Sequence, residues 1–188
     1  MADNQFLKSY LEDLSNLLKP NDDLIKSLIC IRDLLLEVKS HNKKVLIFGN
    51  GGSASIASHI SVDLTKNTGL RCLNFNEADL ITCFANDYGF EHWVEKAIDF
   101  YGDEGDLLIV ISSSGRSENM LNGVKAARSG NFHSVVTLSG FDKDNPLKKL
   151  GDINLWVNNK SYNFVENVHQ IWLLTIVDLL IGSREYSA

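Results

Sequence analysis

The chain has 188 residues, of which 44% are apolar, and its formal net charge at pH 7 is −6. This length and composition are typical of one globular domain with helical additions, so we expect residues 1–188 to form a single domain. The negative charge argues against a nucleic-acid partner, because a nucleic-acid surface needs clustered lysine and arginine.

Two amphipathic helices are predicted at the start of the chain, over residues 4–19 and 22–40, and they form a helical extension over residues 1–41. Pro20 separates them, and Asn21 is placed to cap the second helix. The apolar residues of this second helix recur at spacings of three and four, which predicts one buried face. They are Leu24, Ile25, Leu28, Ile31, Leu35 and Val38.

Short apolar runs alternate with helical patterns over residues 42–188. The predicted strands cover residues 44–48, 71–75, 107–112, 134–138 and 153–157, and the predicted helices cover residues 53–66, 79–100, 117–130 and 163–182. The helix over 79–100 is expected to break near residues 87–89. Strands that are apolar on both faces, such as residues 107–111, belong inside a parallel sheet covered by helices. The expected fold is therefore α/β, a doubly wound layered structure.

The last predicted helix is apolar around its whole axis, which predicts burial in the core and in a subunit interface of a homo-oligomer. Its apolar run over 171–181 is too short to span a bilayer, so we expect no membrane partner. The first residues carry no secretory signal. The cysteines stand far apart and predict reduced, buried thiols in a cytoplasmic protein. They are Cys30, Cys72 and Cys83.

A glycine turn, Gly49-Asn-Gly-Gly-Ser53, follows the first predicted strand. Glycines let the backbone approach a ligand, and the N-terminus of the following helix favours an anion there. Asn50, Gly51 and Ser53 are therefore candidate binding residues. The spacing also fits a loose dinucleotide-binding pattern, although Glu77 is the nearest acid after the second strand. A plain strand-to-helix turn is a further interpretation.

A serine cluster follows the third predicted strand, just before a helix. Ligands of open α/β sheets bind at the carboxyl ends of strands, and hydroxyl groups match the acceptor oxygens of a phosphate. Capping of the helix by a serine is the alternative interpretation. The cluster consists of Ser112, Ser113, Ser114 and Ser117.

Two polar pairs lie in apolar helical settings. His59 and Asp63 are four residues apart, and Glu166 and His169 are three apart, so each pair shares a helix face. Such pairs are either structural or, where they meet at a phosphate site, candidates for acid–base chemistry or a divalent metal. Asp87, in the predicted helix break, either lies in a simple turn or contributes to the same pocket.

These segments, in this order, resemble the sugar isomerase (SIS) family, and within it the bacterial phosphoheptose isomerases. The matching segments are Gly49–Ser53, His59, Ala85–Phe90, Gly105–Ser117, Val136–Gly140 and Val165–His169. The resemblance implies a three-layer fold with a five-stranded parallel sheet and a homotetramer with active sites between subunits. It also implies conversion of sedoheptulose 7-phosphate to D-glycero-D-manno-heptose 7-phosphate through an enediol, toward the heptose of surface polysaccharide.

The resemblance also assigns roles to individual residues. It implies that the sugar phosphate is held by Asn50, Ser53, Ser112, Ser114 and Ser117, with Ser113 nearby and Asp87 on the sugar. The chain departs from the family at five positions, of which three concern the catalytic and metal-binding groups. Asp63 stands where the family has its catalytic Glu, and Glu166 stands where it has a Gln. Leu174 stands where it has a second catalytic His that is also a metal ligand.

Three functional hypotheses follow from these departures. In the first, the chain is an isomerase with Asp63 as base, and with His169 or Glu166 in the role of the missing His. In the second, it isomerises a different sugar phosphate, because the Arg-to-Asn change at Asn67 and the Gln-to-Glu change at Glu166 reshape the sugar-facing side. A substrate-binding Asp of the family also aligns with Asn163.

In the third hypothesis the chain is a non-catalytic sugar-phosphate-binding module, similar to the relative that binds the bacterial replication initiator. For any of the three, a divalent metal such as zinc would be held by His59, Asp63 and Glu166. No other cofactor is expected.

Overall fold

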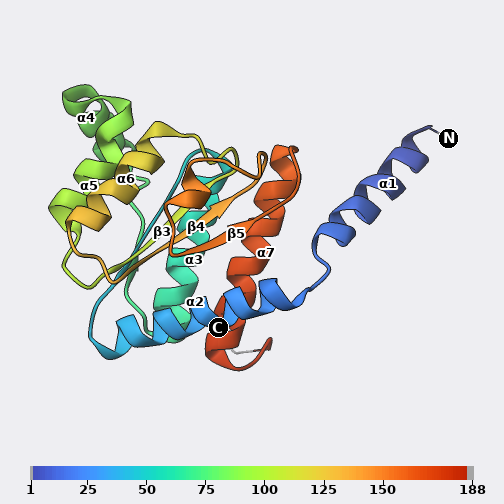
Figure 1. Ribbon diagram of the computed structural model, residues 1–188, viewed down its shortest axis with the longest axis horizontal. Helices are drawn as coiled ribbons and strands as arrows, with labels where there is room; N and C mark the ends of the chain where they lie inside the picture. The colour runs from blue at the N-terminus through green and yellow to red at the C-terminus, as the bar shows by residue number, and fades with distance from the viewer. Residues whose placement is uncertain (1, 186–188) are drawn as a thin grey trace.

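A five-stranded parallel sheet forms the middle layer of the computed structural model, which describes residues 2–185 (Figure 1). The strand order is β2-β1-β3-β4-β5, and every neighbouring pair is parallel. The strands are β1 (Val45–Gly49), β2 (Cys72–Leu73), β3 (Leu107–Ser112), β4 (Ser134–Ser139) and β5 (Ile153–Trp156). The predicted α/β fold is confirmed, and residues 1 and 186–188 of the predicted domain lie outside the described residues.

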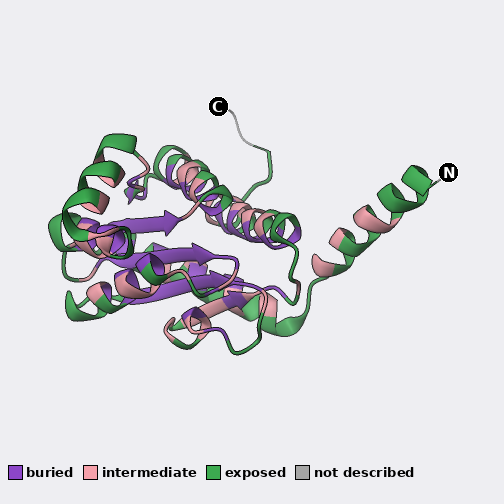
Figure 2. Ribbon diagram, turned by 90° about the horizontal axis from the view of Figure 1, so that it is seen from above, coloured by how far each residue is buried: buried purple, intermediate pink, exposed green. Residues whose placement is uncertain are grey.

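Helices cover both faces of the sheet, which buries the strands between them (Figure 2). One face carries α2 (Asp22–Ser40), α3 (Gly52–Thr68) and α7 (Tyr162–Ile181). The other face carries α5 (Trp93–Tyr101) and α6 (Glu118–Ser129), with α4 (Ala78–Tyr88) at its margin. Two short 3₁₀ turns, Phe90–His92 and Leu147–Lys149, complete the described elements.

The first helix, α1 (Ala2–Leu17), projects away from the three layers (Figures 1 and 2). None of its described residues is buried, and Phe6, Leu7 and Leu11 are exposed. Its ring contact with the main body joins Tyr10 to Phe164, with centroids 4.5 Å apart. An amphipathic helix in this position leaves its apolar face open to solvent in a single chain.

Several local predictions are decided by these elements. Asn21 caps α2 by accepting a hydrogen bond from the backbone of Leu24 at 2.9 Å, as predicted. The expected break between α4 and α5 falls at Gly89, whose φ is +90°. The prediction that Ile25 faces the core was wrong, because Ile25 is 44% exposed on the outer edge of α2's apolar stripe.

The cysteine prediction was right for one residue and wrong for two. Cys72 is buried in the core, whereas Cys30 and Cys83 are exposed on helices, and all three thiols are free. The wide spacing of cysteines in the sequence argued against disulfides but carried no information on which helix face each one occupies.

The last helix, α7, is long and apolar enough to cross a membrane by length and composition alone. In this fold it packs against α2 and α3, and its inner residues belong to the core. Ile171 and Leu179 remain exposed on its outer side. The helix is therefore the core helix of a layered fold, with an outer apolar strip left over.

Candidate active site

The glycine loop and the serine loop meet at one edge of the sheet. They follow β1 and β3, which are neighbours with Gly49 opposite Ile111. Strand order reverses at this point, since β2 lies on one side of β1 and β3 on the other. Ligands of open α/β sheets bind at such a switch point, outside the carboxyl ends of the strands.

A cavity of about 200 Å³ lies between the two loops. We name it the serine cavity. It is lined by Asn50, Ser53, Ile111, Ser112, Ser113, Ser114, Ser117, Tyr162 and Glu166. Six of these residues were predicted to bind the sugar phosphate, so the fold brings both halves of the predicted pocket together.

The backbone of the glycine loop depends on two of its glycines. Gly51 has φ +55°, a conformation that side chains with a Cβ rarely adopt. At Gly52 there is no room for a Cβ, because it would lie 2.6 Å from Cδ of Glu166. Glycine at position 52 therefore lets the carboxyl group of Glu166, on α7, approach the N-terminus of α3.

In the part of the chain that the structure describes, the serine hydroxyls are not engaged in capping the following helix. Ser112 and Ser117 hydroxyls lie 3.2 Å apart, and Ser114 Oγ accepts a hydrogen bond from the backbone of Arg116 at 3.2 Å. Ser117 begins α6 without a side-chain capping bond within the described residues. The buried Ser113 hydroxyl has no partner among residues 2–185. An unpaired buried hydroxyl is costly, so it points to a missing hydrogen-bonding ligand.

Sequence reasoning missed two residues here, one that lines this cavity and one that holds a lining residue in place. Asn119 and Asn50 exchange two amide hydrogen bonds, of 2.9 and 3.1 Å, which tie the glycine loop to α6. Tyr162 lines the cavity from the start of α7. The position of Asn119, two residues after Ser117 on the following helix, was the available signal for the first; the sequence held none for the second.

A second cavity, of about 380 Å³, lies between α3 and α7. We name it the histidine cavity. It is lined by Gly52, Ser55, Ile56, His59, Glu166, Asn167 and Gln170. Glu166 lines both cavities. A ligand with its anionic end in the serine cavity would thus extend past Glu166 toward His59.

His59 lies at the centre of a polar chain across the histidine cavity. Its Nε2 atom is 3.3 Å from Oδ2 of Asp63, on the same helix. Its Nδ1 atom is 3.2 Å from Nε2 of Gln170, on α7. The side chain of His59 is 47% exposed and that of Asp63 is 19% exposed, so the imidazole stands in front of the carboxylate.

The electrostatics of the two cavities centre on Glu166. Burial raises the pKa of Glu166 above its ordinary value. No lysine or arginine from the described part of the chain lines either cavity. Arg116 stands on the serine loop but pairs with Asp142 at 3.3 Å. An anion in the serine cavity is therefore met by hydroxyl groups and helix N-termini rather than by side-chain cations.

Comparison with protein families matches residues 5–140 to the SIS domain. The phosphoheptose isomerase of Fusobacterium nucleatum is 35% identical over 150 residues, covering 77% of this chain and 76% of the relative. The phosphoheptose isomerase of Helicobacter pylori is 31% identical over 96% of both chains. This chain belongs to the SIS domain family.

Solved SIS structures agree with this placement. A phosphoheptose isomerase from Neisseria gonorrhoeae superposes with a TM-score of 0.87 at 25% identity, covering 94% of this chain and 98% of that one. A phosphoheptose isomerase from Francisella tularensis gives a TM-score of 0.86 at 25% identity, covering 97% and 100%. The predicted resemblance to SIS proteins of the phosphoheptose isomerase type is confirmed.

His169 occupies a different position in this SIS protein from the one predicted. It has no exposed surface, its Nε2 atom lies 3.0 Å from the carbonyl oxygen of Ser139, and it lines neither cavity. Burial lowers the pKa of His169 to about 4, so the imidazole is neutral. The predicted catalytic role does not fit this position, because a fully buried side chain cannot touch a substrate.

The predicted metal ligands His59, Asp63 and Glu166 do not assemble into one group. Among residues 2–185, no set of three or more His, Cys, Asp or Glu side chains is arranged to hold a metal ion. His59 and Asp63 meet, while the carboxyl of Glu166 lies against Gly52. An open zinc site needs three protein ligands, so the residues present do not fit a zinc ion.

Asp87 lies in the last turn of α4, where it is exposed. Its carboxylate accepts a hydrogen bond from Asn86 at 2.9 Å, and it is not among the residues that line the two cavities. Figure 1 shows α4 at the margin of the fold, far from α7. Its predicted contact with the sugar therefore stays a prediction for an assembly of several chains.

Proposed function

We propose that this SIS protein is a ketose–aldose isomerase that converts sedoheptulose 7-phosphate to D-glycero-D-manno-heptose 7-phosphate. The product would supply the heptose of surface polysaccharide. The observation that carries the proposal is the serine cavity of about 200 Å³ at the switch point of the sheet, whose lining includes Ser113 with its unpaired buried hydroxyl. The phosphoheptose isomerases of F. nucleatum and H. pylori, at 35% and 31% identity, support the same activity.

The phosphate group would sit in the serine cavity. Ser112, Ser113, Ser114 and Ser117 donate hydroxyl protons to its oxygens, and Asn50 and Ser53 close the opposite wall. The N-termini of α3 and α6 both lie at this cavity. Each is expected to contribute roughly 0.3–1 kcal/mol to the binding free energy of an anion. The sugar chain then passes Gly51 and Gly52 into the histidine cavity.

Isomerisation would proceed in the histidine cavity through an enediol. A base removes a proton from C1 of the ketose, the C–H electron pair forms the C1=C2 double bond, and the C2 carbonyl oxygen gains a proton. Return of a proton to C2 and loss of one from O1 gives the aldose. His59 and Glu166 line this cavity and are the groups placed to move these protons, with Asp63 beside His59 at 3.3 Å.

Deuterium exchange tests this function directly. Incubation with sedoheptulose 7-phosphate in deuterated water is expected to place deuterium on carbon in substrate and product, read by mass spectrometry and NMR. Ser113→Ala should lower the exchange rate at limiting substrate, while Ser129→Ala, an exposed serine at the end of α6, should not. Binding of the sugar phosphate without any exchange would instead establish the non-catalytic binding module and end the isomerase proposal.

A panel of ketose phosphates addresses substrate choice. Asn67 lies beside Asp63, with its amide 3.5 Å from that carboxylate, so its contact with the proposed site runs through Asp63. Faster turnover of a shorter ketose phosphate would replace the heptose assignment but keep the isomerase. Membership of the SIS family favours a sugar phosphate over the dinucleotide that the glycine spacing also allowed. We also propose that the protein is cytoplasmic.

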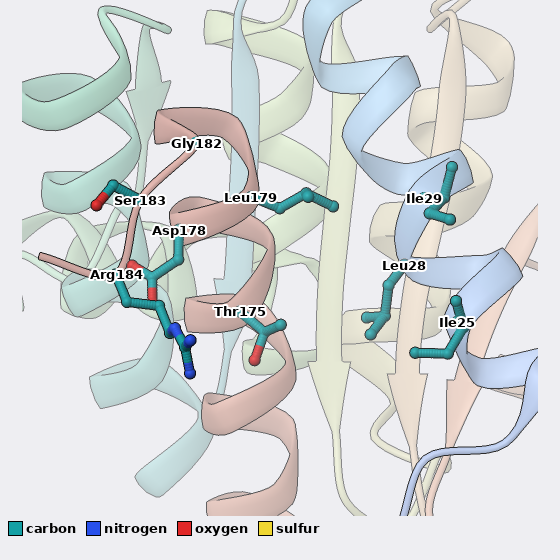
Figure 3. A pocket seen from close by; sticks show the side chains of 9 residues that line it. All are labelled: Ile25, Leu28, Ile29, Thr175, Asp178, Leu179, Gly182, Ser183 and Arg184. Atoms are coloured by element: carbon teal, nitrogen blue, oxygen red, sulfur yellow. The ribbon is translucent and has the colours of Figure 1, made fainter.

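A homotetramer is proposed as the working assembly. The apolar face of α1, with Phe6, Leu7 and Leu11, is uncovered in a single chain. A second uncovered surface is a groove of about 510 Å³ between α2 and the end of α7, where Ile29 and Leu179 face one another (Figure 3). Burial of both surfaces against further copies would remove them from water.

Light scattering tests the assembly. The native chain is expected at four times the 21.0 kDa mass of one chain, and Leu11→Asp is expected to shift it to smaller species. Glu12→Lys, on the polar side of the same helix, is the matched control. A monomeric native chain at working concentration would contradict the proposal.

A further inference from the structure

The contacts of His59 assign which nitrogen of its ring carries a proton. The amide nitrogen of Gln170, 3.2 Å from Nδ1, is a donor only, so Nδ1 is the acceptor. The neutral ring then carries its proton on Nε2. That atom lies at ion-pair distance, 3.3 Å, from Oδ2 of Asp63. The ring therefore presents its basic nitrogen toward α7 and the cavity.

Asp63 itself is poorly placed to receive a proton from a substrate. One of its oxygens faces His59, and the other accepts the amide of Asn67 at 3.5 Å. His59 lines the histidine cavity and Asp63 is not among its lining residues. The aspartate side chain is also one methylene shorter than glutamate, which keeps it behind the ring.

The facing helix contributes a row of side chains spaced by four residues. Glu166, Gln170 and Leu174 lie along one line of α7, and α7 packs directly against α3. Glu166 and Gln170 line the histidine cavity, while Leu174 packs against the core. Leucine offers no donor or acceptor, so Gln170 is the residue of this row that meets Nδ1 of His59.

We propose that Nδ1 of His59 is the atom that moves the proton between C1 and C2, with Asp63 as a positioning residue behind it. This inference rests on the proposed isomerase function and names the atom that performs its central step. A substrate in the histidine cavity takes the place of the Gln170 amide in front of Nδ1. Asp63 holds the ring in one tautomer and stabilises the imidazolium that forms, as a carboxylate behind a catalytic histidine does.

The proposed step is balanced by Glu166. Nδ1 takes the proton from C1, and the C–H electron pair becomes the second bond between C1 and C2. The carbonyl oxygen at C2 receives a proton from the carboxyl of Glu166. In the second half, Nδ1 returns its proton to C2 and Glu166 takes the proton from O1, which restores both groups.

Three variants of the 188-residue chain test the inference by kcat, KM and deuterium exchange at carbon. His59→Gln is expected to lower both kcat and exchange by about 10²- to 10⁴-fold. Asp63→Asn is expected to lower kcat by at least about tenfold with KM little changed, since it alters the tautomer and not the binding surface. His92→Gln is the matched control, because His92 forms a similar helical pair with Glu95 at 2.7 Å and lines neither cavity.

Nitrogen-15 NMR of the ring supplies a readout that a structural role would not move. The native protein should show His59 protonated on Nε2, and Asp63→Asn should shift that tautomer while the resonances of His92 stay unchanged. Full exchange in His59→Gln, or a native ring protonated on Nδ1, would overturn the inference and leave the isomerase function standing.

Zinc provides a further check on the same residue. Addition of Zn²⁺ is expected to leave the His59 resonances and the activity unchanged. Shifted His59 resonances together with a gain in activity would make the ring a metal ligand and overturn the inference. A native chain that exchanges no deuterium at all would overturn the proposed function and this inference with it.

Discussion

Replacement of Gly52 by alanine tests how the two cavities are joined. The added Cβ would lie 2.6 Å from Cδ of Glu166 and closer still to its Oε2, whereas ordinary contact begins at 3.4 Å, so the carboxyl must move by about 1 Å. Misplacement of a reacting group by about 1 Å can lower kcat about 100-fold, or about 2.7 kcal/mol of barrier. Stability should hold or rise by roughly 0.5–1 kcal/mol, because the flexible Glu166 side chain yields and alanine suits a helix better than glycine.

The assay combines kcat and KM for sedoheptulose 7-phosphate with thermal unfolding. Gly130→Ala is the matched control, because a Cβ there would meet the nearest atom at 3.4 Å and the residue lies at the end of α6. In a Glu166→Gln background, Gly52→Ala should cause little further loss, since its effect acts through that carboxyl. Unchanged kcat in Gly52→Ala, or losses that simply multiply in the double variant, would refute the reasoning.

Three further outcomes follow from individual contacts. Ser113→Ala should weaken calorimetric binding of the sugar phosphate by about 10- to 100-fold without lowering the Tm of the free protein, because its hydroxyl has no partner within the described residues; a large fall in that Tm would argue for a structural role. Lys44→Met should cost about 3 kcal/mol in urea unfolding, because it strips the cation 2.6 Å from buried Asp106, and an unchanged midpoint would contradict this. Burial raises the pKa of Asp152, but hydrogen bonds from Arg128, Val135 and Ser134 outweigh it and leave the pKa below 3.8. Its stabilisation is therefore present above pH 3.8 and lost as the pH falls through the lowered value, so Asp152→Asn should flatten the acid side of the stability curve; equal curves would refute this.

The serine cavity was predictable from sequence because its signals are local. Each loop follows a strand with an unmistakable apolar run, and parallel strands bring the loops after β1 and β3 to one edge. The residue types then indicate a role for each loop. The glycines of the first loop let the backbone approach a ligand, and the serines of the second supply hydroxyl groups. No long-range packing information was needed to place the serine cavity.

The faces of α7 were harder to predict because helical spacing alone does not say which row meets the cavity. Glu166 and His169 are neighbours on the helix surface, but they belong to different rows. His169 is three residues after Glu166, which places it in the buried row with Val165 and Leu173. The four-residue step instead puts Gln170 on the cavity side. The useful signal was that His169 has an apolar residue four positions away on both sides. Gln170 carried no signal of its own, since its role depends on His59 from another helix.

The resemblance to the phosphoheptose isomerases places Glu166 where that family has a Gln, and the surroundings of Glu166 suggest a physical reason for this difference. A second negative charge beside a phosphate would oppose binding, and no lysine or arginine of the described chain lines the cavities to offset it. Burial already raises the pKa of Glu166, and a bound phosphate would raise it further. In its protonated form a carboxyl has one donor and one acceptor in nearly the shape of an amide. Under the proposed isomerase function, Glu166 in this form keeps the hydrogen-bonding geometry of the amide and holds a proton that can be transferred.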